Sequence, residues 1–173
     1  MPEVTLRPLE PDDAELLAAM YTHNRAFMAP FDPPRPPDLF TAAGQRRELD
    51  ALVRDRLGDR RHRFLIEADG APAGVISVSN LIRGPFQNAS IGYWVARDLN
   101  GRGIATAAVG EVVAWAFGEA GLHRLEAGTL VDNLRSQAVL RRNRFRRIGR
   151  SARYLFIGGE WRDHLLFART VED

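Results

Sequence analysis

The segment Tyr93–Thr106, YWVARDLNGRGIAT, runs from an apolar strand through a short polar loop into an apolar helix. Gly101 and Gly103 lie in this loop, where glycine can take positive φ and no Cβ keeps a ligand from the backbone. The amides of residues 101–105 then point at one spot, and the positive end of the helix dipole adds to them. The segment predicts an anion site suited to a phosphate group.

Other known phosphate loops differ from this one. A Walker loop ends in G-K-[S/T], which is absent here. A dinucleotide fingerprint needs a third glycine and a βαβ opening, and neither is present. From these residues alone, a tight turn that only caps a buried helix remains the simpler alternative.

The chain around this loop predicts a mixed α/β sheet with helices on its faces. Clusters of apolar and β-branched residues predict strands at Val4–Arg7, Phe64–Ala68, Ala73–Leu81, Ala89–Ala96, Arg124–Leu130, Ser151–Ile157 and Trp161–Thr170. Capping residues and helical spacing predict helices from Asp12 or Asp13 to Asn24, over Ala42–Leu57 after Thr41, over Gly103–Phe117 and from Asn133 to Asn143. Gly92 inside its strand suggests a bulge or a close backbone approach.

Composition limits the class of protein. The 173 residues are 45% hydrophobic and 27% charged with a net charge of +2, which is typical of a globular domain, and we expect one domain over residues 1–173. Because there is no cysteine, disulfides, thiolate metal sites and cysteine nucleophiles are excluded. No long apolar run predicts a membrane span and the N-terminus does not resemble a signal peptide, so a cytoplasmic protein is expected.

Arginines gather in the last third of the chain, and the sequence contains no lysine. Between residues 135 and 153 no acidic residue interrupts Arg135, Arg141, Arg142, Arg144, Arg146, Arg147, Arg150 and Arg153. Such a run creates a positive field suited to phosphates, although a solvated face is an equally good interpretation. We expect no direct nucleic-acid binding, because no aromatic-rich stacking strand accompanies the run.

Four segments carry a family resemblance. NGRGIA (residues 100–105) fits the pattern Q/R-x-x-G-x-G/A and resembles the acyl-CoA pyrophosphate loop of the GNAT superfamily, with Asn in place of Gln or Arg. EAGTLVDNLRSQAVLRRNRF (126–145) is similar to the second half of that fold, where N-x-x-S opens a helix beside the thioester. YLFIGGEWRDHLLFAR (154–169) and NRAFMAPFDPPRP (24–36) are similar to the closing hairpin and the substrate loop of RimJ/RimL enzymes. The chain resembles the RimJ branch, which acetylates N-terminal alanines of ribosomal proteins.

The resemblance implies a GNAT fold of the α/β (α+β) class. Its mixed, mostly antiparallel seven-stranded sheet would be splayed between strands 4 and 5 and flanked by about four helices. It also implies acetyl-CoA as donor and direct attack by a primary amine in a ternary complex. The implied cofactor contacts are Trp94, Val95, Asn100, Gly101, Arg102, Gly103, Ile104, Ala105, Thr106, Asn133 and Ser136.

Three of these residues have implied catalytic roles. By resemblance, the amide of Val95 polarises the thioester carbonyl, Asn133 contacts the pantetheine arm and Ser136 protonates the leaving sulfur. Asn133 and Ser136 are three residues apart at a helix start, so they share a face. Simpler roles stay open, because Asn133 is also a good helix cap and Val95 can be a core residue.

The general base is missing from the expected positions. Many relatives carry a Glu on the strand before the phosphate loop, where this chain has Ala89 and Ser90, and others an acid where it has Arg153. Asp163 and His164 are adjacent, but neighbours on a strand face opposite sides and cannot form one dyad. The scattered histidines show no metal spacing, and no metal is expected.

A weak base favours one class of acceptor. An α-amine with a pKa near 7.7–8.0 is roughly one-tenth neutral at pH 7, whereas a lysine amine is neutral in fewer than about one molecule in a thousand. We therefore expect as acceptor the N-terminus of a protein, such as a ribosomal protein, in a site lined by Arg25, Phe27, Phe31 and Tyr93. A small-molecule amine and a catalytically silent CoA-binding protein are the alternatives, and the chain could be a monomer or a homodimer.

Overall fold

The computed structural model describes residues 2–173, and it has seven strands and four α-helices. The strands are β1 (Val4–Pro8), β2 (His62–Ala68), β3 (Ala71–Ile82), β4 (Asn88–Val95), β5 (Arg124–Leu130), β6 (Arg146–Ile157) and β7 (Glu160–Thr170). The helices are α1 (Ala14–Met28), α2 (Ala42–Leu57), α3 (Ile104–Phe117) and α4 (Leu134–Arg142), with 3-10 turns η1 (Pro11–Asp13), η2 (Pro37–Phe40) and η3 (Arg97–Leu99).

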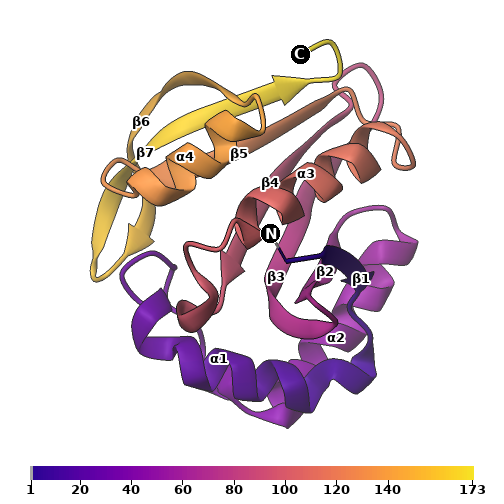
Figure 1. Cartoon of the computed structure of the whole chain (residues 1–173), viewed down its shortest axis with the longest axis vertical. Helices are drawn as coiled ribbons and strands as arrows, with labels where there is room; N and C mark the ends of the chain where they lie inside the picture. Colours follow the sequence, from indigo (N-terminus) through magenta and orange to yellow (C-terminus); the bar gives the residue numbers. More distant parts are fainter. Residues whose placement is uncertain (1) are drawn as a thin grey trace.

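The strands form one mixed sheet in the order β1-β2-β3-β4-β5-β7-β6. Every neighbouring pair is antiparallel except β4 and β5, which are parallel. In Figure 1 the strands β5, β6 and β7 lean away from β1–β4, so the sheet opens like a V at the junction of β4 and β5. The expected splayed GNAT-type sheet is confirmed.

Helices cover both faces of the sheet. The first core packs α3 and α4 against the sheet, through residues such as Val109, Leu140 and Phe167. The second packs α1 and α2 against β2 and β3, through residues such as Leu17, Leu49 and Val75. Figure 1 shows α3 and α4 in front of the strands, with α1 crossing the bottom of the view. α3 is buried because apolar residues lie around most of its circumference.

The N-terminal helix is longer than predicted. It continues past Asn24 to Met28, so Arg25 and Phe27 are helical and the proline-rich loop begins only afterwards. Asp13 stands at the N-cap, but its carboxylate does not cap the helix: it accepts hydrogen bonds from Arg7 and from the amide of Glu10. The cap predicted at Thr41 is confirmed, since its hydroxyl accepts from the Gly44 amide at 3.1 Å.

Two strand predictions need correction. The penultimate strand β6 begins at Arg146, five residues before the expected Ser151, and its register shifts twice against β7. The alternation that marks a strand is broken at these shifts, which is why sequence periodicity missed the first part. Gly92 marks neither a bulge nor a close approach: its register with Ser77 is regular, and a Cβ there would meet nothing within 4 Å.

Candidate active site

The split between β4 and β5 creates an open edge inside the sheet. Their pairing is limited to Asn88–Arg124, Ala89–Leu125 and Ser90–Glu126, after which β4 keeps only β3 as a neighbour. The amide of Ala96 donates to Ala73 on β3 at 2.8 Å. Because amides alternate sides along a strand, the amide one residue earlier, that of Val95, points into the split. It is therefore a free hydrogen-bond donor at the open edge.

A cavity of about 490 Å³ fills this split and is walled by both diverging strands. Next to it lies a groove of about 530 Å³ between the start of α3 and one side of α4. The two hollows share the lining residues Val95, Asn100, Ala105, Arg135 and Val139. They form one channel that runs from the helix terminus to the inside of the sheet.

The predicted phosphate loop, residues 99–106, forms the end of this channel. Gly101 and Gly103 adopt φ values of 81° and 83°, in the left-handed region that favours glycine. Gly103 is the N-cap of α3, and no side chain caps the helix. The first amides of α3 therefore lack intrahelical partners and face the groove, where the dipole adds positive potential.

Asn100 holds the loop from within. Its side-chain amide donates to the carbonyls of Val95, Ala96 and Arg97 at 3.2, 2.9 and 3.3 Å. This is a structural role that the resemblance did not indicate. It explains how Asn can stand where the resembled pattern has Gln or Arg, since the short side chain stabilises the turn that presents the glycine amides.

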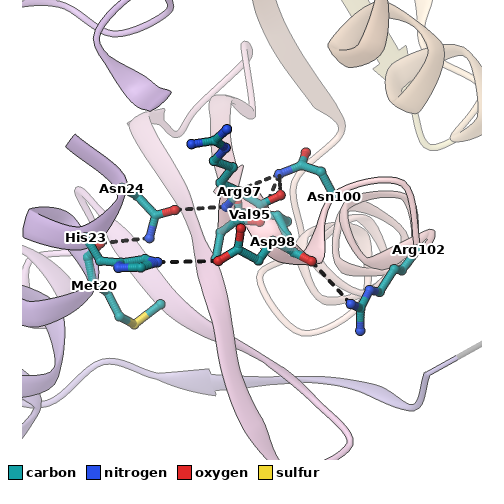
Figure 2. A network of polar contacts seen from close by, with 9 residues as sticks. Met20, His23, Asn24, Val95, Arg97, Asp98, Asn100 and Arg102 are labelled. Atoms are coloured by element: carbon teal, nitrogen blue, oxygen red, sulfur yellow. Dashed lines mark hydrogen bonds and ion pairs between the residues drawn. The ribbon is translucent and has the colours of Figure 1, made fainter. Parts of the chain in front are cut away.

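Side chains of α1 also hold the chain next to the phosphate loop, as Figure 2 shows. Buried Asn24 accepts a hydrogen bond from the Arg97 amide at 2.8 Å and donates to the Met20 carbonyl at 2.9 Å. His23 lies 3.4 Å from the Asp98 carboxylate. The helix that leads to the proline-rich loop is thus tied directly to the phosphate loop.

The arginine run divides into two parts. Arg135 and Arg142, on α4, line the groove beside the phosphate loop, and neither takes part in an ion pair within residues 2–173. Two arginines of the run that lie on β6 form ion pairs outside the groove, Arg150 with Asp163 at 2.7 Å and Arg146 with Asp173 at 2.8 Å. Only the α4 pair is placed to meet an anion in the groove.

Ser136 and Tyr93 meet where the two strands diverge. The Tyr93 hydroxyl lies 3.0 Å from Ser136 Oγ and 3.2 Å from the Ser136 carbonyl. Burial raises the pKa of Tyr93 to about 12, against the opposing effect of the hydrogen bond to Ser136. Tyr93 is therefore a protonated donor at neutral pH. The Asn133 carboxamide oxygen accepts from the Ser136 amide at 3.1 Å, so its helix-capping role is confirmed.

Residues outside β4 and α4 also line the cavity, among them Phe27, Phe31, Glu126, Tyr154 and His164, and we call these five residues the acceptor wall. Phe27 and Phe31 come from the end of α1 and the following loop, and their rings are 6.4 Å apart. The carboxylates that line the cavity are already paired, Asp32 with Arg35 and Glu126 with Arg124, both at 2.8 Å. The wall is thus apolar at Phe27 and Phe31, and its carboxylate already has a partner.

The structure brings together most of the predicted site residues. Along the channel lie Trp94, Val95, Asn100, Gly101, Gly103, Ile104, Ala105, Thr106, Asn133, Ser136, Phe27, Phe31 and Tyr93. Two predicted residues lie outside it: Arg25 stacks on the ring of Phe40 at 4.4 Å, and Arg102 donates to the Asp98 carbonyl at 3.3 Å. Glu126, Tyr154 and Arg142 were missed as site residues.

Asp163 and His164 lie on opposite faces of β7, as strand alternation predicts. The amide of Arg153 and the guanidinium of Arg150 lower the pKa of Asp163 below its usual range. His164 lines the cavity. Within residues 2–173 no cluster of metal-ligating side chains occurs, and no helix of that part is long and apolar enough to cross a membrane.

Comparison with known proteins agrees with this geometry. The model of the acetyltransferase (GNAT) domain matches residues 3–146. The chain belongs to the GNAT acetyltransferase family. Among relatives of this acetyltransferase, the probable N-acetyltransferase YjcK of Bacillus subtilis (strain 168) is 37% identical over 167 residues, which cover 95% of this chain and 92% of the relative.

Two further relatives lie in the RimJ/RimL branch, as the sequence motifs predicted. The ribosomal protein uS5-alanine N-acetyltransferase of Escherichia coli (strain K12) is 30% identical, covering 98% of this acetyltransferase and 89% of the relative. The structure of Mycobacterium smegmatis RimJ in complex with CoA-disulfide matches with a TM-score of 0.94 and 35% identity, covering 98% of this chain and 82% of that one. The chain is therefore an N-acetyltransferase of RimJ type.

Proposed function

We propose that this enzyme transfers the acetyl group of acetyl-CoA to the N-terminal α-amine of a protein with an alanine-type N-terminus, such as a ribosomal protein. The observation that carries the proposal is the continuous channel from the uncapped start of α3 to the split between β4 and β5. A phosphate-bearing donor fits one end, and an amine can approach from the other.

The donor end suits CoA because it offers backbone amides and arginines together. The amides of Gly101 to Thr106 would hold the pyrophosphate, with Arg135 and Arg142 adding charge from α4. CoA bound to the related RimJ structure supports this assignment. When bound, acetyl-CoA supplies the activated acetyl thioester, which the channel would direct towards the split.

At the split, three groups would act on the thioester. The free amide of Val95 would donate to the thioester carbonyl, where negative charge develops during attack. Ser136 Oγ would supply a proton to the departing sulfur, with Tyr93 O–H hydrogen-bonded behind it. Asn133 would orient the pantetheine arm from the start of α4 with the part of its side chain that is not engaged in capping.

The acceptor end favours an α-amine. Its wall is apolar around Phe27 and Phe31, and the carboxylates of Asp32 and Glu126 are already ion-paired. A polyamine needs free carboxylates, so these pairings count against it. A small alanine side chain fits such a wall, and an α-amine is neutral more often than a lysine amine at pH 7. Such an acceptor implies an enzyme that works in the cytoplasm.

We also propose that residues 1–173 form one functional domain. The family match ends at residue 146, but β7 lies between β5 and β6 in the sheet, and His164 and Tyr154 complete the cavity. Removing the last two strands would therefore open the acceptor wall.

A thiol-release assay at pH 7 tests the proposed reaction. The acceptors are an Ala-initiated peptide, the same peptide with a blocked N-terminus and one internal lysine, and spermidine. We expect release with the Ala-initiated peptide at least about tenfold faster than with either other amine, because more of its amine is neutral. Faster release with spermidine would identify a small-amine enzyme. No release with any acceptor, despite CoA binding, would identify a non-catalytic CoA-binding protein.

A further inference from the structure

His164 is a buried histidine at the edge of the channel. It is 3% exposed and belongs to the lining of the cavity in the β4–β5 split. Gly128 on β5 lies against the ring, since a Cβ at Gly128 would be in van der Waals contact with His164 Cδ2 at 3.7 Å. Tyr154 packs against the ring from β6 with a centroid distance of 5.2 Å. Three strands therefore fix the ring in place.

A backbone carbonyl determines which nitrogen of His164 carries the proton. Nδ1 lies 3.1 Å from the carbonyl oxygen of Arg162, and a carbonyl oxygen can only accept a hydrogen bond. Nδ1 must therefore donate. In the neutral ring this leaves the lone pair on Nε2, which has no hydrogen-bond partner among residues 2–173. The cavity wall thus holds an imidazole whose free nitrogen is a proton acceptor.

The register of the strands puts His164 level with the chain segment that leads into α4, the helix that carries Ser136. His164 pairs with Leu130 at the end of β5, and the Leu130 carbonyl accepts from the Asn133 amide at 3.1 Å, immediately before α4 and Ser136. Leu165 and Phe167, one and three residues further along β7, belong to the core under α3 and α4. Alternation therefore turns His164 to the opposite face, from which an acceptor would approach.

Glu126 is the rival base on the acceptor wall. It pairs with Ser90 at the closed end of the split, whereas Tyr93, which contacts Ser136, lies three residues further along β4. Three residues of strand span about 10 Å, so Glu126 stands well behind the reacting groups. Its carboxylate is also bonded to Arg124.

The surroundings of His164 carry few charges. The β5 residues facing it, Gly128 and Leu130, are uncharged, and the titratable group against it from β6 is Tyr154. Its neighbours in the chain are paired away from it, Arg162 with Asp132 and Asp163 with Arg150. No carboxylate of these elements competes for Nε2.

We propose that Nε2 of His164 is the general base for the acceptor amine, an inference that rests on the proposed function. Nε2 takes one proton from the ammonium, and the neutral amine then attacks the thioester carbon. As the C–N bond forms and the C–S bond breaks, Ser136 Oγ passes its proton to sulfur, and the second proton lost by the nitrogen replaces it on Ser136 Oγ. His164 returns its proton to solvent, so one ammonium and one thioester give one amide, one thiol and one H⁺.

The test compares His164→Asn with the wild type at pH 7 and pH 9. Asn keeps an N–H where Nδ1 donates to Arg162 but removes Nε2. We expect kcat/KM for the Ala-initiated peptide to fall about tenfold at pH 7, because about one-tenth of the amine is neutral without help. At pH 9, where more than about nine-tenths is neutral, the deficit should shrink to within about twofold. Affinity for CoA and the Tm should stay unchanged.

Two controls separate this role from a structural one. Asp163→Asn alters the adjacent residue on the other face of β7 and should give the same ratio of rates at the two pH values as the wild type. In the ¹⁵N NMR spectrum of the free protein at pH 9, His164 should carry its proton on Nδ1, independently of any activity. Wild-type inactivity with every amine would reject the proposed function, while this signal would still report on His164.

Three results would overturn the inference. The first is an Nε2-protonated ring in the spectrum. The second is a deficit in His164→Asn that is equal at pH 7 and pH 9, which would mark a structural residue. The third is full activity in His164→Asn together with a loss in Glu126→Gln that higher pH restores, which would make Glu126 the base.

Discussion

The phosphate loop and the acceptor wall line two ends of the same channel, yet the chain builds them in different ways. The phosphate loop is a continuous run of eight residues whose backbone amides form the site, and its side chains mostly stabilise the turn. The acceptor wall takes single side chains from α1, the loop after it, β5, β6 and β7. The phosphate loop therefore depends on backbone conformation, whereas the acceptor wall depends on how the tertiary fold places separate side chains.

This difference has a functional consequence. A backbone site tolerates changes of side chain, as Asn100 illustrates, but it does not tolerate changes of φ. A wall of separate side chains can be changed one residue at a time without disturbing the donor end. We therefore expect substitutions in the loop to impair donor binding and substitutions around the split to impair turnover.

The largest effect is expected from Gly101→Val. Gly101 has φ of 81° and lines the groove, and a β-branched residue cannot hold this conformation without strain. If the turn shifts, one or two amide-to-phosphate hydrogen bonds are lost, each worth about 1.5–3 kcal/mol. The Kd for CoA should rise between about 10-fold and 100-fold or more, which isothermal titration calorimetry measures.

Gly70→Val is the matched control for this prediction. Gly70 has φ of 76° in the turn between β2 and β3, and like Gly101 it has nothing within 4 Å of an added Cβ. Both variants should lose a similar amount of stability. If Gly70→Val weakened CoA binding as much as Gly101→Val, the loss would come from strain in the fold and not from the loop.

A smaller effect, on turnover alone, is expected where Ser136 contacts Tyr93. Ser136→Ala should lower kcat about 10- to 100-fold and leave the Kd for CoA within about twofold, because proton donation matters only during reaction. Tyr93→Phe should lower kcat less, since it removes only the hydrogen bond behind Ser136 Oγ. Stopped-flow and steady-state thiol release measure both effects.

The double variant decides whether the two hydroxyls act as one unit. Tyr93→Phe should cost nothing further once Ser136 is Ala, because residues in one network are non-additive. The ratio of wild-type to Tyr93→Phe rates should stay flat up to pH 10, because the pKa of Tyr93, about 12, keeps the phenol protonated. Independent losses that multiply would show that Tyr93 serves the acceptor and not Ser136.

The same contrast explains what the sequence could predict. The phosphate loop, the four helices and the N-x-x-S helix start are local patterns, and the structure has them with shifts of a few residues at their ends. The end of α1 was misjudged because Arg25 and Phe27 continue a helix into what resembles a loop motif. No local pattern shows that β7 inserts between β5 and β6.

That insertion is why the acceptor wall was only partly predicted. It brings His164 opposite Leu130, and the parallel pairing of β4 with β5 brings Glu126 beside Ser90. Alternation correctly separated Asp163 from His164, but it could not tell which of the two faces the cavity. The fixed tautomer of His164 depends on a contact with the Arg162 carbonyl that spacing alone does not reveal.

The smallest expected effect tests whether side chains contribute to the donor end at all. Arg135→Ala and Arg142→Ala should each raise the Kd for CoA about threefold at low salt, because exposed ion pairs are weak, and the effects should fade as salt increases. Arg147→Ala is the control, since it removes the same charge from the same arginine run but from β6, outside the groove. An equal loss in all three variants would mean that the donor end senses only net charge. A loss confined to the α4 pair would show that the backbone site is assisted by two placed side chains.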